Sequence, residues 1–125
     1  MADHEARPAG PAPVRQQPFT FYAAQGRIYA RNVDQKVIDL GELTEDEGRW
    51  RFELDGNHHS GNGFFTAEEA LREICRDLRF LWLDGQFTAV ADAREGGALN
   101  LDGAVQVEIL LDELAPGERT FDATV

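Results

Sequence analysis

The chain has 125 residues, of which 42% are hydrophobic and 10% are aromatic. That size and apolar content indicate one folded domain with a core rather than a disordered chain. The 23 acidic residues outnumber the 12 basic residues and give a net charge of −11. Such a charge argues against general affinity for nucleic acid or anionic membrane, because both rest on cationic side chains.

The sequence also bears on the cellular compartment. The only cysteine is Cys75, so no disulfide can form within the chain. The first residues lack the hydrophobic segment of a secretion signal, and the apolar run at residues 80–83 is far shorter than the roughly 20 residues that span a bilayer. We therefore expect a cytoplasmic protein with no membrane partner.

Composition divides the chain into three parts. Residues 1–18 hold four of the five prolines and little that can be buried, which predicts a flexible N-terminal arm. The pattern of a folded domain extends over residues 19–114. Residues 115–125 contain Pro116, Gly117 and scattered charges, so we expect a C-terminal tail there.

Four strands are predicted in the first half of the domain. Residues 19–23 and 27–31 are predicted as two short strands, and the Gln-Gly pair that follows Ala24 joins them by a tight turn. A third strand is expected over residues 36–43. The fourth, residues 49–54, has the clearest pattern, because its apolar and charged residues alternate.

A helix follows these strands. Thr66 is placed to cap the helix N-terminus, and Glu69 three residues later completes a capping box. Apolar residues then recur at helical spacing, which predicts an amphipathic helix over residues 67–83 that ends at Gly85. Residues 86–94 and 104–111 are predicted as two further strands.

The order of these elements predicts the fold class. We expect an α+β fold in a single domain, with an antiparallel sheet of five to six strands and one amphipathic helix packed on one face.

The loop at residues 57–63 holds the first candidates for a chemical site, His58 and His59. A zinc site needs three or four ligands, but His4 lies in the predicted arm and Cys75 on the apolar stripe of the helix. No G-x-S-x-G or G-x-x-x-x-G-K-[ST] motif is present. We therefore expect no metal, no cofactor and no catalytic residue, and a small-ligand or enzyme site at this loop is the third of three hypotheses.

Acidic clusters carry the first hypothesis. From residue 84 onward the sequence contains nine acidic residues and only two arginines. A further acidic cluster lies in the predicted turn after residue 43. Such charge suits a protein partner with a basic surface, including a protein that normally binds DNA or RNA. The residues expected to contact it are Glu45, Asp46, Glu47, Asp112 and Glu113.

An alternating set of arginines carries the second hypothesis. Arg27, Tyr29 and Arg31 would share one face of a strand, as would Arg49 and Arg51. On a common face they would form the kind of surface with which β-sheets bind nucleic acid.

One stretch of the chain agrees with that second hypothesis. The pattern W-x-F at residues 50–52, followed by GFFTAEEAL at residues 63–71, resembles the sheet-plus-helix unit of integrase arm-binding domains. The resemblance covers this stretch only, and it implies nucleic-acid binding. The lysine-rich strands of those domains have no counterpart here.

The sequence favours the first hypothesis. The chain is expected to be a non-catalytic, acidic protein-binding module. Its small size and acidity are similar to those of anti-restriction and anti-CRISPR proteins from phages and plasmids, which inhibit nucleic-acid-handling proteins.

Overall fold

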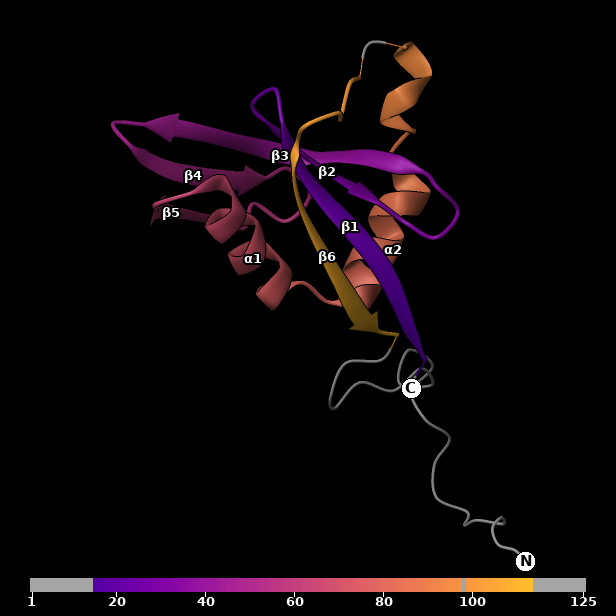
Figure 1. Cartoon of the computed structure of the whole chain (residues 1–125). Helices are drawn as coiled ribbons and strands as arrows, with labels where there is room; N and C mark the ends of the chain where they lie inside the picture. Colours follow the sequence, from indigo (N-terminus) through magenta and orange to yellow (C-terminus); the bar gives the residue numbers. More distant parts are fainter. Residues whose placement is uncertain (1–14, 98, 114–125) are drawn as a thin grey trace, which may run out of the picture.

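The computed structural model describes residues 15–97 and 99–113 of the chain (Figure 1). Its elements are β1 (Gln16–Ala24), β2 (Arg27–Arg31), β3 (Val37–Asp46), β4 (Arg49–Leu54), β5 (Ser60–Phe64), α1 (Ala67–Asp77), α2 (Phe80–Ala89), the short 3-10 helix η2 (Ala93–Gly96) and β6 (Val105–Asp112). The predicted α+β domain is confirmed. No helix in these ranges is long and apolar enough to cross a membrane.

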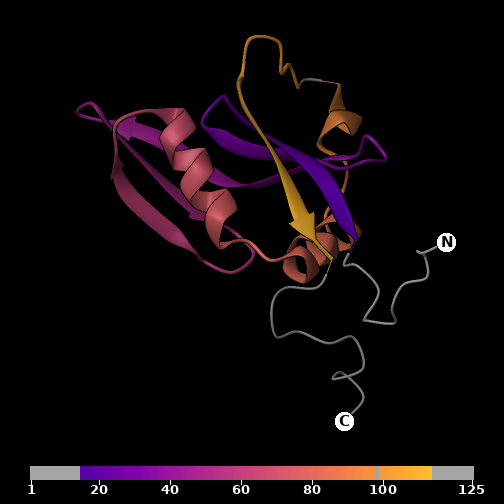
Figure 2. The same cartoon turned by 60° about the horizontal axis from the view of Figure 1, so that its bottom comes forward.

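The six strands form one antiparallel sheet in the order β5-β4-β3-β2-β1-β6. The sheet is strongly curled, and α1 lies in its hollow between the two edge strands (Figure 2). Helix α1 contacts β6 on one side and β5 on the other. A single helix therefore bridges the two edges of the sheet.

Two tight turns set the register of the hairpins. Gln25-Gly26 joins β1 to β2, and Glu47-Gly48 joins β3 to β4. All four of these residues have positive φ angles, between 52° and 80°. Two consecutive positive φ angles match the right-handed twist of paired strands, which is why such turns close two-residue hairpins.

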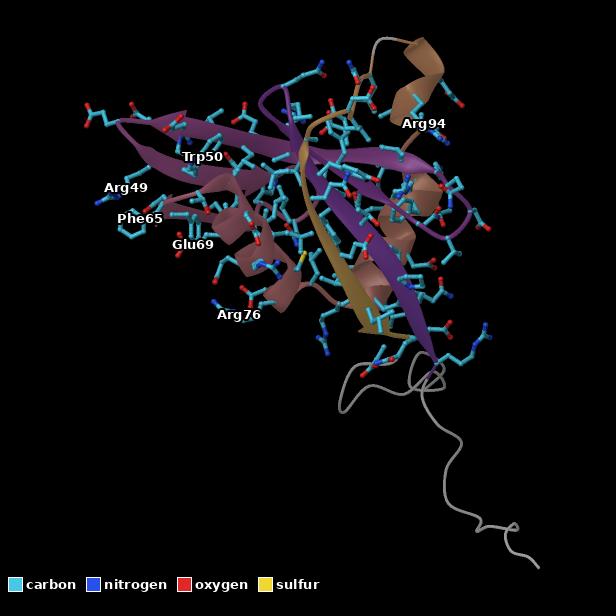
Figure 3. All side chains as sticks on the ribbon, in the orientation of Figure 1. Arg49, Trp50, Phe65, Glu69, Arg76 and Arg94 are labelled. Carbon is cyan, nitrogen blue, oxygen red and sulfur yellow. The ribbon has the colours of Figure 1, made fainter. Side chains whose placement is uncertain are left out.

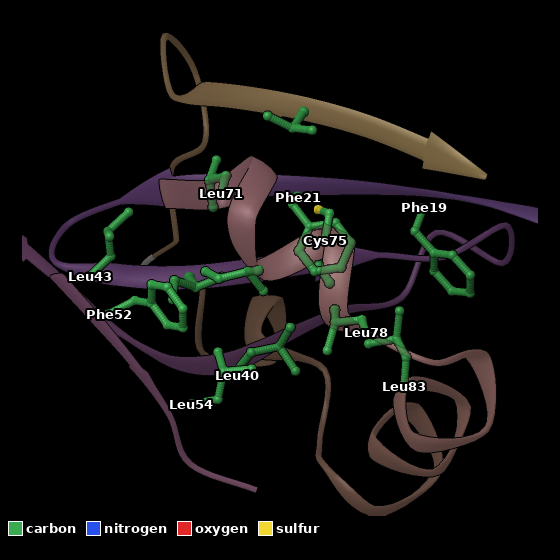
Figure 4. Close-up of a cluster of buried hydrophobic side chains, with 14 of the residues drawn as sticks. Phe19, Phe21, Leu40, Leu43, Phe52, Leu54, Leu71, Cys75, Leu78 and Leu83 are labelled. Atoms are coloured by element: carbon green, nitrogen blue, oxygen red, sulfur yellow. The ribbon is translucent and has the colours of Figure 1, made fainter. Parts of the chain in front are cut away.

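The core fills the space between the concave face of the sheet and the two helices (Figure 4). β1, β2, β4 and β6 contribute alternate residues to it, as a period of two requires. Its most buried side chains include Phe21, Ile28, Ile38, Leu43, Leu54, Leu71, Ile74 and Leu83. A second, smaller cluster of Tyr22, Tyr29 and Val37 lies on the opposite face, under the segment that contains η2.

The prediction of one helix over residues 67–83 is wrong. Leu78 and Arg79 have extended backbones, with ψ angles of 146°, and they separate α1 from α2. The break changes the direction of the chain, so that Phe80, Leu83 and Phe87 enter the core as a new stripe. Burial of these large side chains outweighs the continuation of the first helix.

The strand predicted over residues 86–94 is also wrong. Residues up to Ala89 form the last turn of α2, and η2 follows. Gly85 lies inside α2 rather than after a helix end. The ammonium of Lys36 donates to the carbonyl of Phe87, where a cation stabilises the C-terminal end of the helix dipole.

The predicted start of the helix and two of the predicted strands agree closely with the structure. β4 has the predicted bounds, and Thr66 Oγ1 accepts from the Glu69 N–H at 3.0 Å as a helix cap. β6 lies within one residue of its predicted ends. Three predictions differ from the structure: β3 runs three residues past its predicted end, to Asp46, β5 forms where a loop was predicted, and β1 begins at Gln16, inside the predicted arm.

Candidate protein-binding surface

The predicted acidic cluster lies at the tip of the β3–β4 hairpin. Glu45 and Asp46 end β3, and Glu47 occupies the turn. All three side chains are exposed, and none makes an ion pair with another described residue. The tip therefore presents three carboxylates without an ion pair among the described residues. Glu45 and Asp46 project from opposite faces of β3, and Arg49 is the cross-strand partner of Asp46.

An exposed aromatic residue lies beside this tip. Phe65 is 65% exposed, and the guanidinium of Arg49 lies 4.3 Å from the centre of its ring (Figure 3). The neighbouring Phe64 points the opposite way, since it pairs with Trp50 and stacks on Phe52 in the core. Phe65 is not among the residues predicted from the sequence, although period-two alternation after an inward Phe64 predicts an outward residue there.

The other two predicted acidic residues lie at a different end of the sheet. Asp112 is the last residue of β6 and Glu113 follows it, beside the start of β1. The amide of Gln16 donates to Asp112 Oδ1 at 2.8 Å, and the amide of Gln17 donates to Glu113 Oε2 at 2.7 Å. Both carboxylates are half-buried. The five predicted acidic residues therefore form two separate groups rather than one surface.

The predicted arginine face does form on one side of the sheet. Arg27 pairs with Glu42, which pairs with Glu53, and β4 carries Arg51 and Arg49 further along on the same side. Paired residues project from the same face of a sheet. All five residues of the second hypothesis thus lie on the face opposite α1.

That face is not a free cationic surface. Arg27 donates to Asp39 at 3.0 Å and to Asp55 at 2.9 Å. The hydrogen bond to Asp39 raises the pKa of the Arg27 guanidinium. Tyr29 is only 7% exposed, because the segment around η2 covers it. Arg31 lies over the ring of Tyr22 at 5.5 Å. The interleaved carboxylates make this face a weaker candidate for nucleic acid than the sequence implied.

The histidine loop is anchored by packing. The ring of His59 lies 5.3 Å from that of Phe52, and its Nε2 is 3.4 Å from Asp77 Oδ2, beyond good hydrogen-bond geometry. The N–H of Leu54 donates to the His59 carbonyl at 2.8 Å. His58 is exposed and has a positive φ angle of 55°. The loop therefore joins β4 and β5 to the end of α1.

Nothing else in the described ranges brings together a recognisable chemical site. No group of three or more His, Cys, Asp and Glu side chains there has the arrangement of a metal site. Cys75 is a buried residue of α1 in the hydrophobic core, and burial raises the pKa of its thiol to about 12. A thiol in that environment is a poor nucleophile.

Comparisons of this chain with protein-family models, with curated proteins and with solved structures gave no match.

Proposed function

We propose that the chain is a non-catalytic module that binds a basic protein through the tip of the β3–β4 hairpin. One observation carries the proposal: Glu45, Asp46 and Glu47 are all exposed at this tip, and none of them makes an ion pair with another described residue. Clustered charge without internal partners raises the rate and specificity of association with an oppositely charged surface.

The neighbouring Phe65 supplies what charge alone does not. Aromatic and arginine side chains contribute more binding energy at interfaces than most other residues. Phe65 and Arg49 already lie against each other, so little side-chain freedom is lost when a partner covers them. The hairpin tip would therefore steer the partner, and the Phe65–Arg49 pair would anchor it.

The partner class follows from the same chemistry. A surface of closely spaced carboxylates imitates a run of phosphates, so the partner we propose is a nucleic-acid-handling protein that the module inhibits in the cytoplasm. An origin in a phage or plasmid fits that role.

Affinity capture tests this proposal. The chain is immobilised, exposed at low salt to a lysate of the organism that encodes it, and eluted with rising salt. We expect a basic protein to be retained by the wild type and lost by the variant Glu45→Gln, Asp46→Gln, Glu47→Gln. Phe65→Ala should weaken retention at low salt as well.

A second triple variant serves as the matched control. Asp84→Asn, Glu95→Gln and Asp102→Asn remove the same charge from exposed positions elsewhere. If this control loses the partner as fully as the tip variant does, net charge alone explains binding and the proposal fails. Equal retention by wild type and tip variant would also contradict it.

A further inference from the structure

Strand β6 is an edge strand whose backbone is open on one side. Only β1 pairs with it among the described strands. The Glu113 N–H donates to the Arg15 carbonyl at 2.8 Å, so Glu113 belongs to a hydrogen-bonded pair with β1. Such pairs alternate along an antiparallel ladder. The N–H and C=O groups of Gln106, Glu108, Leu110 and Asp112 therefore point away from β1 and toward the open edge.

A groove runs along this edge beside α1. Its floor is apolar and consists of Val107, Ile109 and Leu111, and its wall includes Cys75 and the two arginines of α1. The cavity there is about 250 Å³. Leu110 is 61% exposed and borders this cavity as well as two others. An added strand would place alternate side chains on that floor and bond to the open backbone groups.

The charges along the groove are unequal. Arg72 is paired with Glu68 at 2.8 Å, and Arg76 is paired with Glu73, so the wall is already neutralised. On the outer face of β6, by contrast, Glu108 makes no described ion pair, and Asp112 is bonded only to an uncharged amide. The uncompensated charges of this edge are therefore negative. They lie on either side of Leu110, four residues apart.

We propose that β6 accepts an extended segment of a partner protein as a seventh strand, and that this segment carries two basic residues four positions apart with apolar residues between them. The basic residues lie opposite Glu108 and Asp112, and the central apolar residue lies opposite Leu110. The two flanking apolar residues enter the groove over Ile109 and Leu111. Opposite charges directly across two strands stabilise their pairing.

A second copy of this chain fits the edge less well. When two β6 strands pair antiparallel around Leu110, Glu108 of one copy faces Asp112 of the other. Like charges directly opposite destabilise a pair of strands. The site lies at the opposite end of the molecule from the β3–β4 hairpin (Figure 1), so it does not depend on the function proposed for that tip.

The probe is the peptide Thr-Lys-Val-Val-Val-Lys-Thr, blocked at both ends and added to the full chain. NMR is expected to show that the peptide slows hydrogen exchange at the amides of Glu108, Leu110 and Asp112. The amides of Ile109 and Leu111 already bond to β1 and are expected to change little. A peptide of the same composition with adjacent lysines, Thr-Val-Lys-Lys-Val-Val-Thr, should bind about two- to fivefold more weakly, because only one lysine can face a carboxylate.

A charge exchange makes the test specific. The variant Glu108→Lys, Asp112→Lys should lose the lysine peptide and bind the matching peptide Thr-Glu-Val-Val-Val-Glu-Thr. The single variant Glu108→Lys changes only an exposed side chain. Its binding of the two peptides can therefore be measured even if the double variant folds poorly. The variant Glu45→Gln, Asp46→Gln, Glu47→Gln should bind the lysine peptide as the wild type does.

Several results would overturn the proposal. The lysine peptide could fail to bind, or its effects could map to the hairpin tip. The charge exchange could leave the preference between peptides unchanged. Protection of Glu108 and Leu110 that appears without peptide and vanishes on dilution would assign the edge to a second copy instead.

Discussion

The ring of Phe87 stacks on the ring of Phe19, with 5.8 Å between their centroids. Phe80, two helical turns earlier, lies 6.2 Å from the same ring. A side chain of the first strand is thus held between two residues of α2. This contact fixes α2 against the sheet, and it explains why the chain bends after α1.

Phe87→Ala tests the contribution of that contact. Removal of a buried phenylalanine ring leaves a cavity, and we expect the free energy of unfolding to fall by about 3 to 5 kcal/mol. Leu81→Ala is the matched control on the same helix, since Leu81 is 54% exposed, and it should change stability by less than about 0.5 kcal/mol. Urea unfolding followed by tryptophan fluorescence gives both values. Similar midpoints for the two variants would show that α2 is not packed on β1.

Two glycines should respond in opposite ways to alanine. A Cβ at Gly41 would lie 2.2 Å from the carbonyl oxygen of Glu53, and the φ angle of Gly41 is +155°. The backbones of β3 and β4 must move apart to admit it, so we expect Gly41→Ala to cost more than about 3 kcal/mol or to prevent folding. At Gly85, inside α2, a Cβ meets nothing within 4 Å. Gly85→Ala should stabilise the chain by up to about 1 kcal/mol.

Thermal melting of both glycine variants checks this pair. A stable Gly41→Ala protein would mean that the two strands are further apart at this point than described. A Gly85→Ala protein that melts below the wild type would place Gly85 outside a helix.

Cys75 should be almost inert in the folded chain. Burial raises the pKa of its thiol from 9.0 to about 12, so at pH 8 the thiolate fraction is roughly a thousandfold below that of a free cysteine. Iodoacetamide is expected to label the native protein slowly and the urea-unfolded protein quickly. Fast labelling of the native protein at pH 8, read by mass spectrometry, would show that the thiol is accessible.

The same shift makes stability depend on pH in the alkaline range. The unfolded chain loses the thiol proton near pH 9, whereas the folded chain keeps it until about pH 12. The contribution of Cys75 is therefore present below pH 9 and is lost as the pH rises toward 12. Stability of a Cys75→Ala variant should fall less steeply over this window than that of the wild type.

Glu47→Asn should raise stability while weakening the proposed interaction. Asparagine adopts the positive φ of this turn more readily than glutamate, which predicts a gain of about 0.5 to 1 kcal/mol. Gln25→Asn in the other hairpin turn, where φ is 58°, is the matched control and should give a similar gain. Partner capture should fall only for Glu47→Asn. Equal capture by both variants would remove Glu47 from the binding surface.

Local sequence patterns predicted those elements whose own side chains decide their structure. β4 alternates apolar and charged residues. The start of α1 depends on Thr66, which caps the helix by accepting from the N–H of Glu69 three residues later. The end of α1 could not be predicted in this way, because Leu78 continues its apolar stripe and only the distant Phe19 makes a break favourable. β5 has no strand-like composition, and pairing with β4 defines it.

For the candidate binding surfaces, too, local patterns predicted some features, and distant strand pairing decided the others. Charge clusters were visible in the sequence, and the tip residues Glu45 to Glu47 are indeed adjacent and exposed. Whether charges gather or cancel depends on register, which local patterns leave open. Arg27 meets Asp39 and Asp55 only because the strands pair as they do. Asp112 is distant from the tip for the same reason.

The pairing of Gln16 with Asp112 means that the polypeptide enters and leaves the domain at one place. Paired residues in neighbouring antiparallel strands lie roughly 5 Å apart. The domain can therefore be grafted into a surface loop of an unrelated host protein without forcing the two sides of that loop apart. A circular permutant is feasible for the same reason: a short linker would join the chain near Asp112 to the chain near Gln16, and the new termini would lie in the Gln25-Gly26 turn.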